Sequence, residues 1–272
     1  MFSSEPLSAT ESAVLETFVV PRYLERFGAL VLSMLLPTEG ARVAHVGCRT
    51  GYPDREICQR VSRATVYGVD RSLAALELAR YKATAASVPA QYLHSEALPT
   101  PLPAAAFSHV ISLCPILTAA ERGALFAEMA RLLYTGGQVL IALPLRGSFQ
   151  EIGDLLREYA LKHDDGDLGR SIDEAMASRP TIETLSEELE AYGLGDVDVE
   201  VHQETLSFDN GRSLIEDPIS RLLVIPELRS GLGGRELQGP IEYLRDAADR
   251  YWSETEIELS VNVGCASARR VD

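Results

Sequence analysis

Short apolar runs alternate with amphipathic stretches through the first 145 residues of the chain. Five of the runs predict buried strands, and most of the stretches around them show the three-to-four-residue spacing of helices. The expected strands are Arg42–Val46, Thr65–Val69, Gln91–Leu93, Phe107–Leu113 and Gln138–Leu143. The expected helices are Ser12–Leu36 with a kink at Pro21, Asp54–Ser62, Ser72–Ala86 and Ala119–Leu133, the last stopped by residues 135–137. This alternation predicts an α/β fold with a parallel sheet covered by helices on both faces.

The pattern is less regular after residue 145. It predicts helices over Phe149–Leu161, Thr181–Tyr192, Leu214–Leu223 and Ile241–Trp252, and strands over Val197–Phe208 and Glu256–Ala266. Residues 162–180 are polar and acidic, without clear periodicity. No repeat or low-complexity linker separates the halves, so one domain is expected over residues 1–272. Its parts are a helical cap (1–36), a core (40–145), an insertion (146–180) and a C-terminal part of the sheet with its helices (181–272).

Acidic residues outnumber basic ones by 40 to 25, which gives a formal net charge of −15. A nucleic-acid binder needs basic residues to neutralise phosphate, and a peripheral membrane protein needs them to meet anionic lipid, so neither partner is expected. The charge is uneven, because residues 1–150 sum to +1 and residues 151–272 to −16. The acidic second half predicts either a solvated surface or a contact for a basic acceptor or protein partner.

The sequence lacks signals for export, membrane insertion and metal binding. Its N-terminus has no cationic segment followed by an apolar one, and the longest apolar stretch is far shorter than the ~20 residues that span a bilayer. The four cysteines, at 48, 58, 114 and 265, show no CxxC spacing and no cluster with histidine. We therefore expect a soluble cytoplasmic protein without a metal site or a disulfide framework. Its oligomeric state is left open.

The loop after the first expected strand is the leading candidate for ligand binding, because doubly wound sheets bind ligands beyond the carboxyl ends of their strands. Residues 46–51 read VGCRTG. Gly47 and Gly51 allow a sharp turn, with free N–H groups expected at the start of the following helix. A dinucleotide fingerprint, GxGxxG, would need a third glycine at Tyr52, so an NAD-dependent oxidoreductase is disfavoured.

This loop resembles the GxGxG loop of class I S-adenosylmethionine-dependent methyltransferases, which commonly reads hDhGCGTG. The resemblance extends over about residues 40–145, and less specifically to the C-terminus. Asp70 ends the second strand, 19 residues after Gly51, where the family has an acid that binds ribose. The segments 95–99 (SEALP), 104–112 (AAAFSHVIS) and 126–143 (FAEMARLLYTGGQVLIAL) resemble family motifs in the same order.

The resemblance implies a doubly wound, mostly parallel seven-stranded sheet with a C-terminal antiparallel strand, and S-adenosylmethionine as the cofactor. It implies that Asp70 holds the ribose hydroxyls, since a charged carboxylate is a strong acceptor for two hydrogen bonds. It also implies that Glu96 and Ala97 meet the adenine. The full implied set of cofactor-binding residues is Gly47, Cys48, Arg49, Gly51, Asp70, Arg71, Glu96, Ala97 and Cys114.

Four positions depart from the family pattern. His45 replaces the acid of the first strand, Ser108 replaces a common aspartate, and Cys114 with Pro115 replaces a polar or aromatic motif. Arg49 replaces the middle glycine of the loop, and two interpretations follow. Its side chain turns outward or pairs with the carboxylate of the cofactor, which leaves binding intact, or the pocket has lost S-adenosylmethionine.

Two functions are open at this point. The first is methyl transfer from S-adenosylmethionine to an O, N or C atom of a small-molecule or carrier-bound acceptor. The layout resembles the stand-alone small-molecule methyltransferases, including the enzyme that methylates a malonyl thioester. The second is a non-catalytic methyltransferase-like protein that binds a partner through its acidic second half.

No catalytic residue is assigned, because methyl transfer from a sulfonium can be accelerated by positioning alone. Candidates for acceptor contacts are Tyr23, Phe27 and residues 146–180, and candidates for a general base are His94 and His202. His45 and His109 lie in expected buried strands, which favours hydrogen-bonded core histidines. Cys114 is either a pocket residue or a small buried side chain.

Overall fold

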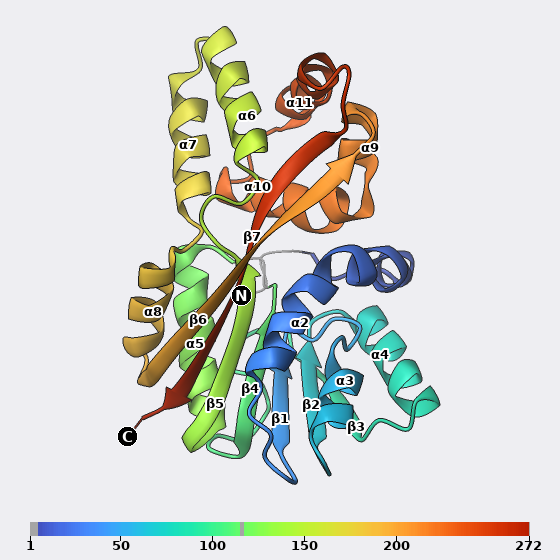
Figure 1. Cartoon of the computed structure of the whole chain (residues 1–272), viewed down its shortest axis with the longest axis vertical. Helices are drawn as coiled ribbons and strands as arrows, with labels where there is room; N and C mark the ends of the chain where they lie inside the picture. Colours follow the sequence, from blue (N-terminus) through green and yellow to red (C-terminus); the bar gives the residue numbers. More distant parts are fainter. Residues whose placement is uncertain (1–4, 115–116, 272) are drawn as a thin grey trace. The chain divides into compact units, whose positions relative to one another are not determined.

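The computed structural model describes residues 5–114 and 117–271, and Figure 1 traces the chain. Contacts within it divide the chain into two compact units. The sheet unit comprises residues 1–143, 182–201 and 264–272, and the helical unit comprises residues 144–181 and 202–263. Strands β6 (Leu194–Phe208) and β7 (Ile257–Arg270) have residues in both units. The expectation of a single domain stays a prediction.

The sheet has seven strands in the order β3-β2-β1-β4-β5-β7-β6 within the described residues. Its parallel part consists of β1 (Arg42–Val46), β2 (Thr65–Asp70), β3 (Ala90–His94), β4 (Phe107–Leu113) and β5 (Leu133–Pro144). The C-terminal part of the sheet is antiparallel, because β7 runs opposite to its neighbours β5 and β6 (Figure 1), which confirms the predicted fold class. The strand order reverses between β1 and β4, so the crevice that favours ligands in such sheets lies there.

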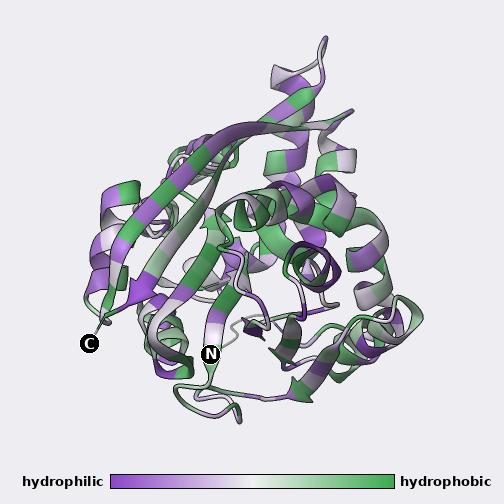
Figure 2. Ribbon diagram, turned by 60° about the horizontal axis from the view of Figure 1, so that its bottom comes forward, coloured by the Kyte–Doolittle hydropathy of each residue, from purple (hydrophilic) through white to green (hydrophobic). Residues whose placement is uncertain are grey.

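Burial explains why the central strands are apolar runs. Every residue of β4 is buried, as expected for a strand with helices on both faces. The outermost strand, β6, instead alternates buried or half-buried with exposed positions along its first half, and Asp196, Asp198 and Glu200 are exposed. Figure 2 shows the same contrast between the apolar central strands and the mixed colouring of the long C-terminal ones.

The junction of α5 (Ala119–Leu132) and β5 corrects one prediction. Residues 135–137 were expected to separate the helix from the strand, but the strand follows the helix directly at Leu133. Phe107 pairs with Leu133 and His109 pairs with Gln138, so residues 134–137 form an irregular bulge inside the strand. The positive φ of Gly136, 81°, permits this bulge.

The remaining helices of the sheet unit agree with the predictions to within a few residues. They are α1 (Ala9–Val14), a π-helical segment η1 (Leu15–Leu24), α2 (Glu25–Met34), α3 (Asp54–Arg60), α4 (Leu73–Ala85) and α8 (Ile182–Glu190). Pro21 lies inside η1. Because proline has no N–H to donate, the regular α-helical pattern is interrupted around it, at the predicted kink.

The helical unit contains α6 (Gln150–Lys162), α7 (Gly166–Ala177), α9 (Gly211–Glu216), a π-helical turn η2 (Ser220–Val224), α10 (Ile225–Gly231) and α11 (Gln238–Tyr251). Helix α7 was not predicted. Leu168 and Ile172, four residues apart, are its only buried positions, and Asp165 caps its start. A stripe this narrow within an acidic segment gives too weak a periodicity to detect.

The prediction of one helix over Leu214–Leu223 is also wrong, because the chain leaves the helical conformation within this range. Helix α9 ends at Glu216, and Asp217 adopts an extended ψ of 138° before Pro218. Proline disfavours the helical conformation of the residue that precedes it, which explains the break at Asp217. Within the described residues, no helix is long and apolar enough to cross a membrane.

Candidate cofactor site

The loop from β1 to α3 turns sharply through left-handed conformations. Gly47 and Gly51 have φ values of 74° and 79°, and Arg49 between them has φ 45°. The N–H groups of Gly47 and Cys48 both donate to Val69 O, at 2.8 and 3.1 Å, and that of Gly51 donates to Cys48 O. The first two of these bonds hold the loop against β2, and the third closes the turn within the loop.

Asp70 lies at the carboxyl end of β2 and is 5% exposed. Its Oδ2 accepts the N–H of Arg49 at 3.0 Å, and its Oδ1 accepts the N–H of Ser72 at 2.8 Å. These two bonds fix the orientation of the carboxylate. A carboxylate can accept about four hydrogen bonds, so it keeps capacity for both hydroxyls of a ribose. On this observation the residues present fit the ribose of a nucleoside cofactor.

The side chain of Arg49 crosses the crevice at the reversal of strand order. Its guanidinium Nη1 donates to Leu113 O at 3.1 Å, and Nη2 donates to Cys114 O at 2.6 Å, both at the carboxyl end of β4. The alternative in which the Arg49 side chain turns outward is therefore wrong. Cys114 contributes its carbonyl to this contact, while its side chain is buried. Pro115, the neighbouring departure from the family pattern, lies outside the described residues.

The loop after β3 lies beside the end of β2 that carries Asp70. His94 Nε2 lies 3.0 Å from Arg71 O and 3.0 Å from Glu96 Oε1, and the Arg71 guanidinium is 3.8 Å from Glu96 Oε2. The Glu96 side chain is 64% exposed, and Ala97 O accepts the hydroxyl of Ser95. The structure thus brings Asp70, Arg71, Glu96 and Ala97 together. His94 serves there as a hydrogen-bonding partner of Glu96.

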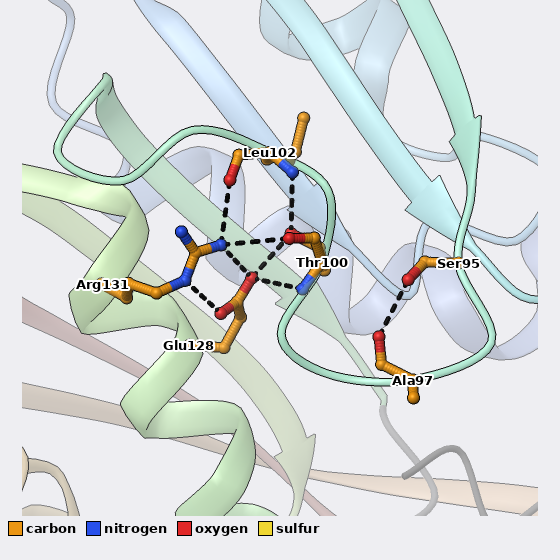
Figure 3. A network of polar contacts seen from close by, with 6 residues as sticks. All are labelled: Ser95, Ala97, Thr100, Leu102, Glu128 and Arg131. Atoms are coloured by element: carbon orange, nitrogen blue, oxygen red, sulfur yellow. Dashed lines mark hydrogen bonds and ion pairs between the residues drawn. The ribbon is translucent and has the colours of Figure 1, made fainter.

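A buried carboxylate anchors this loop to α5 (Figure 3). Glu128 Oε1 accepts the N–H and the hydroxyl of Thr100, at 2.9 and 2.6 Å. Both oxygens of Glu128 also accept from Arg131, whose guanidinium donates in addition to the carbonyls of Thr100 and Leu102. The pKa of Arg131 is raised chiefly by its hydrogen bonds to Glu128. These two residues of segment 126–143 therefore hold in place the loop that carries Glu96 and Ala97.

Beneath the glycine loop lies a polar cluster that the sequence did not reveal. His45 Nδ1 is 2.7 Å from Asp54 Oδ1, and Tyr92 Oη donates to Asp54 Oδ2 at 2.9 Å. His45 is therefore a hydrogen-bonded core histidine, as predicted. Asp54 appeared only as the first residue of an expected helix, and no spacing rule links it to His45 or Tyr92.

The cysteine side chains near the loop are poor nucleophiles. Burial raises the pKa of the Cys48 thiol well above its usual value, and the charges of Asp70 and Asp54 raise it further. Burial also raises the pKa of Cys58 to about 11, with a further contribution from Asp54. Both thiols are protonated near neutral pH, so Cys48 contributes backbone and packing to the site.

Other predicted residues lie in the core or away from the loop. His109 Nε2 lies 2.9 Å from Leu36 O, and burial lowers the pKa of this histidine, which confirms a core position. Tyr23 and Phe27 are buried, with ring centroids 5.0 Å apart, so neither presents an exposed face to an acceptor. His202 is exposed on β6, in the helical unit.

A cavity of about 650 Å³ adjoins the second half of the glycine loop. Thr50, Gly51 and Tyr52 line it together with parts of η1, α3, α4 and β3. Lys82 Nζ pairs there with Glu16 Oε1 at 2.5 Å and donates to Thr50 O at 3.0 Å. Asp70 and Arg49 do not line it, so this cavity is distinct from the crevice.

Solved structures share this fold at low sequence identity. The YcgJ protein of Bacillus subtilis is 13% identical, with a TM-score of 0.61 over 91% of this chain and 99% of that one. A putative methyltransferase of Bacillus halodurans is 17% identical, with a TM-score of 0.57 over 90% of this chain and 99% of that one. Within the sequence, residues 43–137 match the family model described as a methyltransferase domain. Residues 43–137 are therefore similar to a methyltransferase domain, and this match covers about a third of the chain.

Two curated relatives are more similar in sequence than these solved structures are. The malonyl-[acyl-carrier protein] O-methyltransferase of Halorhodospira halophila is 30% identical over 166 residues, which is 58% of this chain and 54% of the relative. The enzyme of the same name from Serratia marcescens is 31% identical over 127 residues, which is 47% of this chain and 48% of the relative. The chain therefore spans about half the length of the curated relatives it matches.

Proposed function

We propose that this chain is a methyltransferase, which binds S-adenosylmethionine at the carboxyl ends of β1, β2 and β4 and transfers its methyl group to an acceptor. The observation that carries the proposal is the buried Asp70 carboxylate. Two backbone N–H groups orient it at the crevice of a methyltransferase fold, and it keeps unused acceptor capacity for a diol.

The site residues divide into three roles in this proposal. Gly47, Cys48 and Gly51 shape the loop beside the cofactor, and Asp70 holds its ribose. Arg71, Glu96 and Ala97 border the adenine, the first after β2 and the other two on the loop that Glu128 and Arg131 anchor. Arg49 and the carbonyl of Cys114 lie against the remainder of the cofactor.

When bound, S-adenosylmethionine supplies an electrophilic methyl group: the acceptor lone pair forms a bond to the methyl carbon while the electrons of the carbon–sulfur bond stay on sulfur. The chain has to hold the nucleoside, align the acceptor and exclude water. No side chain is assigned as a general base. A hydroxyl or amine acceptor would lose its proton to solvent, whereas a carboxylate acceptor has no proton to lose.

The acceptor class is an O, N or C atom of a small molecule or of a carrier-bound group. The two curated relatives are named for methylation of a malonyl group on acyl-carrier protein, which makes a carrier-bound carboxylate the first acceptor to test. The comparisons give no support to the non-catalytic alternative. A basic protein partner stays a prediction from the acidic second half.

Calorimetric titration tests cofactor binding. We expect S-adenosylmethionine and S-adenosylhomocysteine to bind with micromolar dissociation constants, and Asp70→Ala to abolish binding. Asp198→Ala, which removes an exposed acid from β6, is the matched control and leaves affinity unchanged. Absence of binding by the unaltered chain at millimolar ligand would overturn the proposal.

A transfer assay tests the acceptor separately. The chain is incubated with S-adenosylmethionine labelled in the methyl group and with a malonyl thioester of a carrier protein. Label in a base-labile methyl ester indicates O-methylation of the carboxylate. Cofactor binding without label transfer would exclude this acceptor while retaining the cofactor site.

A further inference from the structure

We propose that the cavity beside the second half of the glycine loop binds a small organic cation, an amine with an aromatic or other apolar body. This site is separate from the crevice assigned to the cofactor, because neither Asp70 nor Arg49 lines it. The proposal goes beyond the proposed function and does not depend on it. It is supported by the shape of the cavity, by two polar atoms without partners and by the sign of its charge.

The shape of the cavity follows from the two helices beside it. Helices α3 and α4 connect neighbouring parallel strands, so right-handed crossovers place both on one face of the sheet. Helix α3 has seven residues and α4 has thirteen, so α3 covers only part of α4. Ala79, Ala83 and Ala86 recur on α4 at helical spacing and line the cavity of about 650 Å³. This volume is typical of sites for small organic molecules.

Tyrosine side chains line the cavity from its buried end to solvent. Tyr92 is 8% exposed, Tyr52 is half-buried and Tyr81 is 72% exposed. Because the hydroxyl of Tyr92 already donates to Asp54, this residue offers its ring to a ligand. The faces of aromatic rings attract organic cations, and the rings also cover the apolar body of a ligand.

Two buried oxygen atoms of the lining residues have no hydrogen-bond partner within residues 5–114 and 117–271. One is Oγ1 of Thr50, a residue that is 1% exposed, and the other is Oε2 of Glu16. Both residues meet Lys82, whose Nζ donates to Thr50 O at 3.0 Å and pairs with Glu16 Oε1 at 2.5 Å. A buried acceptor without a donor costs free energy. A ligand ammonium group has three N–H donors, enough for both oxygens.

Negative charge predominates along the remainder of the lining. Apart from the ion pair of Lys82, its charged side chains are Glu25, Glu56 and Arg55, which leaves one negative charge in excess. Both acids act on one neighbour, since burial raises the pKa of Tyr52 and the charges of Glu25 and Glu56 raise it further. A negative potential favours a cation over an anion of the same shape.

Titrations with three phenyl compounds test the proposal in the full chain. They are 2-phenylethylamine, 2-phenylethanol and phenylacetate, which are cationic, neutral and anionic at pH 7. Dissociation constants are measured by NMR chemical-shift titration, with and without S-adenosylhomocysteine. We expect the amine to bind about fivefold more tightly than the alcohol and phenylacetate to bind most weakly. The preference for the amine should narrow at high salt.

Two variants and one control locate the bound amine. Glu16→Gln keeps the shape of the side chain and removes its charge, so the affinity for the amine should fall about fivefold, with little change for the alcohol. Thr50→Val replaces the hydroxyl with a methyl group, which should weaken amine binding about threefold or more. Glu77→Gln removes an exposed acid of α4 that does not line the cavity, and both affinities should stay unchanged.

The outcomes separate this site from the cofactor crevice. Equal affinities for the amine and the alcohol in the unaltered chain overturn the proposal, whether or not the variants fold. A folded Glu16→Gln protein that keeps the full preference also overturns it. Competition between the amine and S-adenosylhomocysteine would place the amine in the crevice and overturn the separate site. If S-adenosylhomocysteine itself does not bind, the proposed function fails while the phenyl compounds still test the amine site.

Discussion

His45 and Asp54 form a buried pair beneath the glycine loop, with Nδ1 of the histidine 2.7 Å from Oδ1 of the aspartate. The side chains are 0% and 1% exposed. The other oxygen of Asp54 accepts the hydroxyl of Tyr92 from β3. The methyltransferase pattern that this loop resembles has an acid at the position of His45, on the first strand. Here the acid comes from the first turn of α3 instead, so a carboxylate still lies under the loop.

Removal of this carboxylate should destabilise the fold strongly. In Asp54→Ala, the imidazole of His45 and the hydroxyl of Tyr92 lose their common acceptor in a site that water does not reach. Breaking a buried pair typically costs about 3 kcal/mol or more. We expect a decrease of about this size in the free energy of unfolding, measured by urea denaturation with fluorescence detection.

Glu39→Ala is the matched control for this substitution. Glu39 pairs with Arg63 at the surface, where the two side chains are 64% and 79% exposed. Exposed pairs contribute about 0–1 kcal/mol, so the control should change stability little. Similar losses in the two variants would contradict a special role for the buried cluster.

Gly51 and Gly40 separate backbone strain from steric crowding. Both have positive φ, 79° and 70°. A Cβ on Gly51 would lie 2.7 Å from Tyr92 Oη, whereas a Cβ on Gly40 would meet no atom within 4 Å. In Gly40→Ala the free energy of unfolding should fall only by the cost of the left-handed conformation, about 1–2 kcal/mol. In Gly51→Ala the free energy of unfolding should fall clearly more in the same urea measurement, because Tyr92 must move and its hydrogen bond to Asp54 weakens.

Equal losses of stability in the two alanine variants would show that Tyr92 moves aside without a cost in stability, which would contradict this prediction. The double variant Gly51→Ala with Tyr92→Phe adds a direct check. Without the hydroxyl, the closest contact to the new methyl group disappears, so the two substitutions should be less destabilising together than the sum of their separate effects.

The sequence was sufficient for the elements whose signal is local. The apolar runs of β1, β2, β4 and β5 and the amphipathic spacing of α5 each lie within one stretch of chain. Asp70 was predicted from the resemblance, because it ends the second strand where the resembled family has an acid, and its role stays a prediction. Its backbone donors, Arg49 and Ser72, belong to the same two turns and follow from that geometry.

The features that the sequence missed depend on contacts across the fold. The direction of Arg49 is set by two carbonyls of β4, more than 60 residues away. The pairing of His45 with Asp54 requires the turn that the glycine loop makes, and the role of Glu128 requires Thr100 to lie beside α5. Helix α7 was missed for another reason, since two buried residues are too few to define a helical face in the sequence.

Glu128 should matter for both stability and ligand binding. In Glu128→Ala, the N–H and hydroxyl of Thr100 and the guanidinium of Arg131 lose their acceptor, so we expect a loss of about 3 kcal/mol in urea. Released from α5, the loop that carries Glu96 and Ala97 should also bind S-adenosylhomocysteine more weakly by calorimetry.

Glu128→Gln provides the graded control for this anchor. Its amide oxygen can still accept from Thr100, but it carries no charge to pair with Arg131. We expect an intermediate loss of stability and a smaller loss of affinity than in the alanine variant. A fully stable Glu128→Ala protein would show that the loop is held by other contacts.

His109 should make stability depend on pH below neutrality. Burial lowers the pKa of its imidazole below the usual 6.5, a lowering only partly opposed by the hydrogen bond to Leu36 O. As the pH falls through 6.5, the unfolded chain binds a proton that the folded chain excludes, so stability decreases until the folded pKa is reached. The free energy of unfolding, measured from pH 7.5 to 5.5, should therefore fall more steeply for the unaltered protein than for His109→Gln. Carboxylates contribute equally to both proteins and cancel in this comparison.

The range between pH 7.5 and 8.5 is the control, because the imidazole is neutral there in both the folded and the unfolded state. The difference in the free energy of unfolding between the two proteins should therefore be constant in this range. Parallel curves over the whole range from pH 5.5 to 8.5 would contradict the effect of burial on His109.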